Sequence, residues 1–297
     1  MIEGTVDLAD GRRLAYAQGG ETDAPAVLYC HGFPTNRREL ALLQPALERS
    51  AVRARVLAFN RPGYGASTFQ AARSFLAWPR DVAEAADRLG IASFAVLGVS
   101  GGCPYALACG YALGDRVTRI GIVAGVAPTE ATGMSRATVL AQPSAIGLLR
   151  RIQFGMAALA LRHGREDRFL ERSIASMGAA DRAAMTHPET REWMAETLQE
   201  SFQQGGRPIA HEAGLYRRPW GFELSEITQP TLIWHGDADE TVPATAGRWL
   251  ADRLPGADYR LLAGHGHFTW MPSDEGAAIV GATASSELSR TSSSVGG

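Results

Sequence analysis

The chain contains no lysine, so all 29 of its basic residues are arginines. This absence excludes every chemistry that depends on a lysine amine, including Schiff-base catalysis, attachment of pyridoxal phosphate and phosphate binding by a P-loop or kinase lysine. Cysteine is scarce too, because the 297 residues include only three, and none lies in a Cys-x-x-Cys arrangement. A sparse, odd set of cysteines is typical of a reduced protein, and we expect a cytoplasmic location.

Long hydrophobic runs and an excess of one charge are also missing. The uncharged stretch between Arg88 and Asp115 is interrupted by glycine, serine and proline, which favours a buried strand, turn and helix over a membrane span. The formal net charge of −2 argues against a nucleic-acid or acidic-membrane partner. The first residues show no basic and apolar leader pattern. We expect a small-molecule substrate, no nucleic acid and no membrane partner, and a homodimer stays open.

Short continuous apolar runs alternate with helical patterns along both ends of the chain. Such runs mark strands buried on both faces, as in a parallel sheet. Residues 79–89 carry apolar side chains at i, i+3, i+4 and i+7, and Gly90 suits the end of that helix. The repeated order predicts a doubly wound, mostly parallel α/β sheet. The predicted strands cover residues 26–30, 56–59, 94–99, 120–123, 231–234 and 259–262, and further helices cover residues 105–113 and 243–254.

The pattern changes near the middle of the chain, where runs typical of buried strands stop. Alanine, methionine, arginine and glutamate at helical spacing predict an inserted helical cap. We predict a core over residues 1–128 and 222–288, a cap over residues 129–221, and a disordered tail over residues 289–297, which is rich in serine and glycine. Four aromatic residues either pack the cap onto the core or line an apolar substrate pocket. These residues are Trp193, Phe202, Trp220 and Phe222.

The sharpest motif is GVSGG at residues 98–102, which matches Gly-x-Ser-x-Gly between a predicted buried strand and a predicted helix. In that context the serine stands on a strained turn, and the flanking glycines let strand and helix approach closely. The turn exposes the hydroxyl of Ser100 and directs the N–H of Gly101 toward a developing oxyanion. We therefore predict Ser100 as a catalytic nucleophile.

A serine nucleophile needs a histidine base, and the base needs a carboxylate that orients it. In this architecture the three follow in the order serine, acid, histidine. The strand over residues 231–234 leads to Asp237 and Asp239, and we favour Asp239 because an aspartate in a turn, such as Asp237, bonds its own backbone. The loop after the last strand carries His265 and His267, of which we favour His267. A metal site on this pair is disfavoured, because no further ligands stand at a recognisable spacing.

A second oxyanion donor is expected from the loop after the first parallel strand, where HGFP begins at His31. The glycine allows a tight turn, so that the N–H of Phe33 can point to the same place as the N–H of Gly101. We interpret His31 as a structural turn residue. Arg37 and Arg38 follow this loop, and we interpret them as solvated surface residues, with contact to an anionic substrate as the alternative.

Taken together, these motifs resemble the α/β-hydrolase superfamily in its lidded, single-chain form, over nearly the whole chain. The chain departs from many members at Asn60, where they carry aspartate; this is a turn position, and we expect no catalytic effect. The cap matches no pattern that we can name. The resemblance rests on HGFP at residues 31–34, NRPGYGAS at 60–67, GVSGG at 98–102, Gly236 with Asp239, and GHF at 266–268.

The resemblance implies an α/β-hydrolase fold with a helical cap, with Ser100 as nucleophile, Asp239 as acid and His267 as base. It also implies the N–H groups of Phe33 and Gly101 as the oxyanion hole. A serine at this position argues against epoxide and haloalkane hydrolysis, which use an aspartate.

Serine forms an acyl-enzyme that water hydrolyses, so we expect a serine esterase, acting on an ester, thioester or lactone of a small to medium, mostly apolar substrate, without cofactor or metal. The alternatives are a cofactor-free haloperoxidase, perhydrolase or carbon–carbon hydrolase with the same triad, and a non-catalytic ligand receptor.

Overall fold

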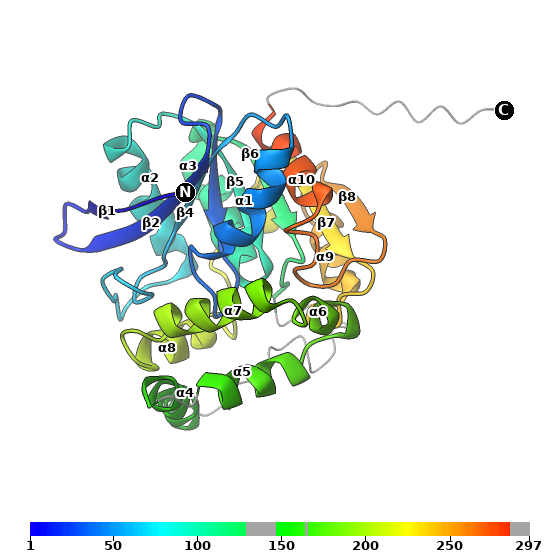
Figure 1. Ribbon diagram of the computed structural model, residues 1–297. Helices are drawn as coiled ribbons and strands as arrows, with labels where there is room; N and C mark the ends of the chain where they lie inside the picture. The colour runs from blue at the N-terminus through cyan, green and yellow to red at the C-terminus, as the bar shows by residue number, and fades with distance from the viewer. Residues whose placement is uncertain (129–146, 164–165, 286–297) are drawn as a thin grey trace.

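The computed structural model describes residues 1–128, 147–163 and 166–285, and its centre is an eight-stranded sheet (Figure 1). The strands are β1 (Ile2–Asp7), β2 (Arg13–Gly20), β3 (Ala26–Cys30), β4 (Arg55–Phe59), β5 (Phe94–Val99), β6 (Val117–Val123), β7 (Thr231–Gly236) and β8 (Asp258–Leu262). Their order is β1-β2-β4-β3-β5-β6-β7-β8. The six strands β3 to β8 pair in parallel, whereas β1 pairs antiparallel with β2 and β2 pairs antiparallel with β4. The predicted mostly parallel α/β sheet is therefore confirmed.

Every predicted strand coincides with one of the parallel strands to within a few residues. The antiparallel hairpin of β1 and β2 was missed. Most residues of β1 are exposed, and only Val6 is buried, so the strand shows no continuous apolar run. The criterion that finds strands by continuous apolar runs does not detect a strand such as β1, which has no such run.

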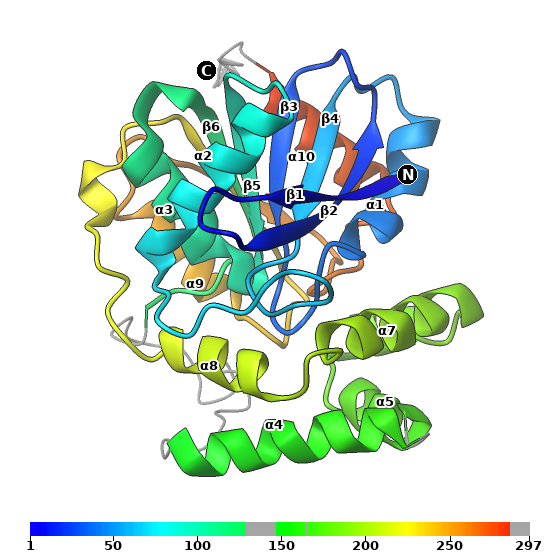
Figure 2. The same ribbon diagram turned by 90° about the vertical axis from the view of Figure 1, so that its left-hand side faces the viewer.

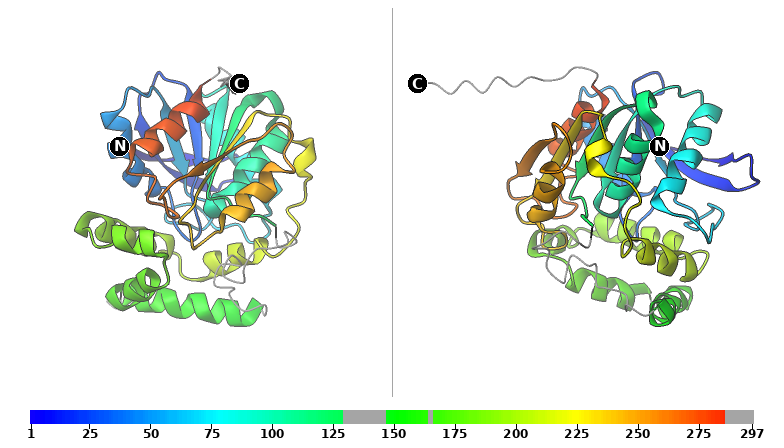
Figure 3. Two further views of the ribbon diagram at one scale, coloured as in Figure 1. Left: turned by 90° about the vertical axis from the view of Figure 1, so that its right-hand side faces the viewer. Right: turned by 180° about the vertical axis from the view of Figure 1, so that it is seen from behind.

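Helices cover both faces of the sheet (Figure 2 and Figure 3). The core helices are α1 (Glu39–Arg49), α2 (Trp78–Arg88), α3 (Cys103–Leu113), α9 (Ala244–Ala251) and α10 (Asp274–Ala284), and the short 3₁₀ helices are η1 (Phe75–Ala77), η2 (Ser100–Gly102), η3 (Gly114–Arg116) and η4 (Leu224–Glu226). Helices α1 and α10 pack side by side, while α2, α3 and α9 share the other hydrophobic cluster. The predicted helix over residues 243–254 is shorter in the structure, because buried Leu254 packs from a turn beyond the end of α9.

Five more helices lie together across the edge of the sheet at which the parallel strands end (Figure 1). They are α4 (Gly147–Arg162), α5 (Glu166–Ala175), α6 (Ala179–Ala184), α7 (Pro188–Ser201) and α8 (Arg207–Leu215). We call these five helices the cap. The predicted start of the inserted segment at residue 129 and the predicted tail over residues 289–297 lie outside the described residues. Among the described residues, no helix is long and apolar enough to span a membrane.

Candidate active site

Ser100 lies at the end of the central strand β5, on a turn that leads directly into α3. Its φ angle of 52° is in the left-handed region, which a residue with a side chain adopts only under strain. The flanking glycines are required by space. A Cβ atom at Gly102 would stand 1.9 Å from the carbonyl oxygen of Cys30, and one at Gly98 would stand 2.7 Å from the Cβ of Ala106. The strand and the helix that flank Ser100 therefore approach each other as closely as this motif predicts.

Asp239 and His267 come together at the same edge of the sheet. Asp239 follows β7, and its Oδ2 lies 2.8 Å from Nδ1 of His267 in the loop after β8. The other oxygen, Oδ1, accepts hydrogen bonds from the N–H groups of Thr241 and Val242 at 2.9 and 2.8 Å. These two amides fix the carboxylate, so that it can orient the imidazole with Nε2 directed away from Asp239.

The pair shifts the pKa of both members. Burial disfavours a charged imidazole at His267, but the Asp239 carboxylate outweighs it and raises the pKa of His267 above its usual value. Burial also opposes ionisation of Asp239, yet attraction from His267 and hydrogen bonding from His235 hold the pKa of this carboxyl well below its usual range. Asp239 is therefore a carboxylate at neutral pH, and His267 is a stronger base than a free histidine.

The two competing residues, Asp237 and His265, make different contacts. Oδ1 of Asp237 accepts a hydrogen bond from the N–H of Gly264 at 2.7 Å, which ties the histidine loop to β7. The expectation that Asp237 bonds its own backbone is wrong in detail, because its partner lies in the neighbouring loop. His265 contributes its backbone carbonyl, which accepts a bond from Ala238 at 3.0 Å. Among the described residues, no cluster of His, Cys, Asp and Glu side chains could hold a metal ion.

The backbone segments that carry the two candidate oxyanion donors, Phe33 and Gly101, approach each other closely. A Cβ atom at Gly101 would lie 3.2 Å from the nitrogen of Phe33 and 2.8 Å from its Cβ atom. No backbone acceptor among the described residues takes up the N–H of Phe33. Glu39 stabilises the loop that carries Phe33, because its carboxylate accepts a hydrogen bond from the N–H of Gly32 at 3.1 Å. His31 is buried and accepts a bond from the N–H of Arg61, as a structural residue would.

A buried ionic cluster joins helix α8 of the cap to this loop. Glu212 is fully buried and pairs with Arg61 and Arg73, each at 2.7 Å. Burial opposes the charge on Glu212, but the two guanidinium groups lower its pKa to about 2. Arg61 also donates to the carbonyl of Gly32 at 2.8 Å. The oxygen of Tyr216, just past α8, lies 2.8 Å both from Glu212 Oε1 and from the carbonyl oxygen of residue 101.

A second contact from the cap reaches the histidine loop. Asp181 of α6 is fully buried, and its carboxylate accepts the N–H of His267 at 2.7 Å and the N–H of Phe268 at 3.0 Å. A side chain at Gly266 would collide with it at 2.6 Å. Asp181 and Glu212 could not be predicted from the sequence, because no motif distinguishes them from the exposed acidic residues of the same segment.

Arg37 and Arg38 do not lie free at the surface. Arg37 is largely buried and pairs with Glu200 of α7 at 2.5 Å and with Glu3 at 2.8 Å. Arg38 also reaches Glu200, at 2.7 Å. Both expectations for this pair are therefore corrected, since the arginines bind the cap and their charge is already neutralised. Asn60 likewise donates to Glu200, at 2.8 Å.

Known proteins resemble this chain in part of its sequence and in its fold. A curated relative, a pimeloyl-(acyl-carrier protein) methyl ester esterase from Aromatoleum aromaticum, is 34% identical over 77 residues, which cover 25% of this chain and 31% of that protein. The match thus spans less than a third of the relative's length.

Solved structures match over most of the chain. A hydrolase from Pseudomonas aeruginosa has a TM-score of 0.69 and 20% identity, with 94% of this chain and 98% of that chain covered. An enol-lactonase from Burkholderia xenovorans has a TM-score of 0.67 and 19% identity, with 93% and 96% covered. Such identities show the fold alone. The family model of the α/β-hydrolase fold matches residues 25–273. The chain therefore belongs to the α/β-hydrolase fold family.

Proposed function

We propose that the protein is a serine hydrolase that cleaves a carboxylic ester, thioester or lactone through an acyl-enzyme. Ser100 is the nucleophile, His267 is the general base and acid, and Asp239 orients the imidazole. The N–H groups of Phe33 and Gly101 form the oxyanion hole. Membership of a hydrolase family supports the reaction class, and the fixed Asp239–His267 pair supports the roles.

The mechanism follows from these positions. Nε2 of His267 takes the proton of Ser100 as Oγ attacks the carbonyl carbon, and the negative charge on the carbonyl oxygen is bound by the two amides. The tetrahedral intermediate collapses when His267 returns this proton to the leaving alcohol, which leaves the acyl group on Ser100. Water then repeats the sequence, giving its proton to His267, and releases the carboxylic acid and the free serine.

The observation that carries the proposal is the buried carboxylate of Asp239, bonded at 2.8 Å to a histidine at the sheet edge at which Ser100 stands on a strained turn. A stability role alone does not require a left-handed serine at the end of a buried strand. Strain of this kind clusters at active sites, and at Ser100 it supports a functional role.

The surroundings of the site favour a small to medium, mostly apolar substrate. Phe33 packs edge-on against Phe154 of the cap helix α4 and against Tyr216, with ring centroids 6.1 and 5.5 Å apart. Aromatic walls of this kind accommodate apolar acyl or alcohol groups. The curated relative is named as a methyl ester esterase and one structural neighbour as an enol-lactonase. Both names agree with acyl transfer, and neither identifies the substrate here.

The test is covalent labelling with a fluorophosphonate probe, followed by turnover of p-nitrophenyl esters of increasing acyl length, lactones and a β-diketone. The native protein should be labelled at Ser100 and should hydrolyse at least one ester or lactone. Ser100→Ala should abolish labelling and lower turnover on the order of 10³-fold or more. Ser176→Ala, on an exposed turn of the cap, is the matched control and should leave both unchanged.

Other outcomes separate the alternatives. Turnover of the β-diketone but of no ester would indicate carbon–carbon hydrolysis by the same triad. Absence of labelling at Ser100 in the folded protein would favour a ligand receptor and would overturn the proposal.

A further inference from the structure

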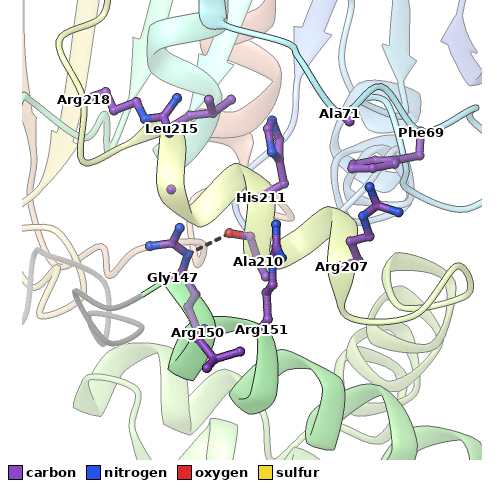
Figure 4. Close-up of a pocket in the computed structure, with 12 residues that line it drawn as sticks. Phe69, Ala71, Gly147, Arg150, Arg151, Arg207, Ala210, His211, Leu215 and Arg218 are labelled. Atoms are coloured by element: carbon purple, nitrogen blue, oxygen red, sulfur yellow. Dashed lines mark hydrogen bonds between the residues drawn. The ribbon is translucent and has the colours of Figure 1, made fainter.

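A groove on the cap, between α4 and α8, has four arginine side chains among the residues that line it (Figure 4). Its volume is about 360 Å³. Arg150 and Arg151 come from the first turn of α4, Arg207 begins α8, and Arg218 lies just beyond the end of α8. Among the described residues, no aspartate or glutamate lines the groove. The described part of its wall therefore concentrates positive charge.

The arginines repel one another. Burial lowers the pKa of Arg150, and the nearby positive charges of Arg217, Arg218 and Arg151 lower it further. Like charges held a few ångströms apart near a protein surface cost free energy unless counter-charges offset them. Arg37 and Arg38, in contrast, are paired with Glu200. A bound anion would offset the charge of the arginine cluster in the groove.

Arg150 is held in a fixed position. Its Nε donates to the carbonyl of Ala210 in α8 at 2.8 Å, as Figure 4 shows. Gly214 makes room for the guanidinium, because a Cβ atom there would lie 2.7 Å from Nη2 of Arg150. One edge of this guanidinium is thus used to join α4 to α8.

The groove and the catalytic centre lie on different faces of α8. Ala210 and Gly214 line the groove, whereas Glu212 faces the buried pair of Arg61 and Arg73. Helix α8 therefore separates the arginine cluster from the loop that carries Phe33. A ligand in the groove does not need to touch Ser100.

We propose that the groove between α4 and α8 is an anion-binding site for a soluble ligand that carries a phosphate or diphosphate group. Planar guanidinium groups donate in pairs to tetrahedral oxyanions, and several can share one phosphate. A single carboxylate has fewer acceptor oxygens and one charge, and it would offset the cluster less. Residues from both ends of α8 line the groove, and a nine-residue helix is about 13.5 Å long at 1.5 Å per residue, so the groove has room for a group longer than one phosphate ion. The proposal does not depend on the catalytic roles given above.

The experiment is titration calorimetry of the full chain with inorganic diphosphate at low ionic strength. We expect saturable binding at one site. Arg151→Gln combined with Arg218→Gln should weaken it at least tenfold, because each removes a charged donor. These two are chosen because Arg150 also holds α4 to α8. The matched control is Arg80→Gln, an exposed arginine on α2 with the same loss of charge. It should change the affinity by less than twofold.

Further binding experiments distinguish this site from the other places and ligands that could account for diphosphate binding. Protein labelled at Ser100 by a fluorophosphonate should bind diphosphate as well as the free protein does; loss of binding would place the anion at the catalytic centre and overturn the proposal. Citrate binding as tight as diphosphate binding would contradict a phosphate site. Binding to vesicles of phosphatidylglycerol, with none to diphosphate, would show a membrane surface instead. Equal weakening by Arg80→Gln and by the double variant would show that only net charge matters.

Discussion

Replacing Asp181 by alanine is expected to weaken both the fold and catalysis. This carboxylate lies in the cap helix α6, is fully buried, and accepts the backbone N–H groups of His267 and Phe268 at 2.7 and 3.0 Å. It therefore holds the loop that carries the candidate base from a helix far away in the sequence. Alanine would leave both N–H groups without their acceptor.

The magnitude follows from these two contacts. A hydrogen bond to a charged group contributes about 1.5–3 kcal/mol, and a buried donor left without a partner loses that contribution. Asp181→Ala should therefore lower the free energy of unfolding by about 3–6 kcal/mol. Asp181→Asn keeps one carbonyl oxygen, so it should cost about half as much. For a chain of this size each kcal/mol corresponds to about 2–4 °C in the melting temperature.

Catalysis should respond separately from stability. A displacement of about 1 Å at a reacting group can cost about 100-fold in rate, so we expect kcat to fall at least tenfold while KM changes little. The negative charge of Asp181 also helps to raise the pKa of His267. Asp181→Asn should therefore move the acidic limb of the rate profile to lower pH. A residue that only stabilised the fold would not move that limb.

The assay is ester hydrolysis as a function of pH, with the melting temperature measured on the same samples. The control is Glu171→Gln, an exposed cap carboxylate paired with Arg191 at the surface, which should cost less than about 0.5 kcal/mol. Wild-type melting temperature and wild-type kcat in Asp181→Ala would refute the reasoning, because both contacts would then carry no energy.

Three other predictions concern the site itself. His267→Ala should lower kcat on the order of 10³-fold, whereas His265→Ala should lower it far less. The kcat values of the two variants check the choice of base, and the reverse order would assign the base to His265. The base acts as a neutral imidazole, so activity should be lost as pH falls through the raised pKa of His267. Asp239→Asn should lower both the rate and the apparent pKa in the pH–rate profile. An unchanged apparent pKa in this variant would contradict the pairing of Asp239 with His267. Gly102→Ala should give insoluble or strongly destabilised protein in expression and melting assays, because its Cβ would stand 1.9 Å from the Cys30 carbonyl; a stable, active variant would show that the turn adapts.

Much of the core could be predicted because the relevant signals are local. Inner parallel strands such as β5 and β7 are largely buried on both faces, so most of each appears in the sequence as a continuous apolar run. Ser100 and its glycines lie within five residues, and Asp239 lies just beyond the end of a strand. Parallel strands end at one edge of the sheet, which is why residues so far apart along the chain were expected to lie close together.

The cap's contribution could not be predicted, because it depends on contacts between distant segments. Asp181 meets a loop some 86 positions later, and Glu212 meets an arginine some 139 positions earlier. Neither residue belongs to a motif, and each resembles the exposed acids around it. Arg37 was interpreted as surface for the same reason, since its pairing with Glu200 becomes visible only when α7 is positioned. Ion pairs between segments that are distant in the sequence cannot be recognised from the spacing of residues.

These contacts show how strongly the cap is connected to the catalytic centre. A buried carboxylate such as Glu212 is tolerated only while both of its arginines remain in place, and removing one partner of such a cluster costs about 3–5 kcal/mol. Arg61 also donates a hydrogen bond to the carbonyl of Gly32, in the loop that carries Phe33, and so connects Glu212 to that loop. Any shift of α8 would therefore disturb the candidate oxyanion donor, and any shift of α6 would disturb the loop of His267. The cap therefore supports both loops that carry candidate catalytic groups, through buried polar contacts.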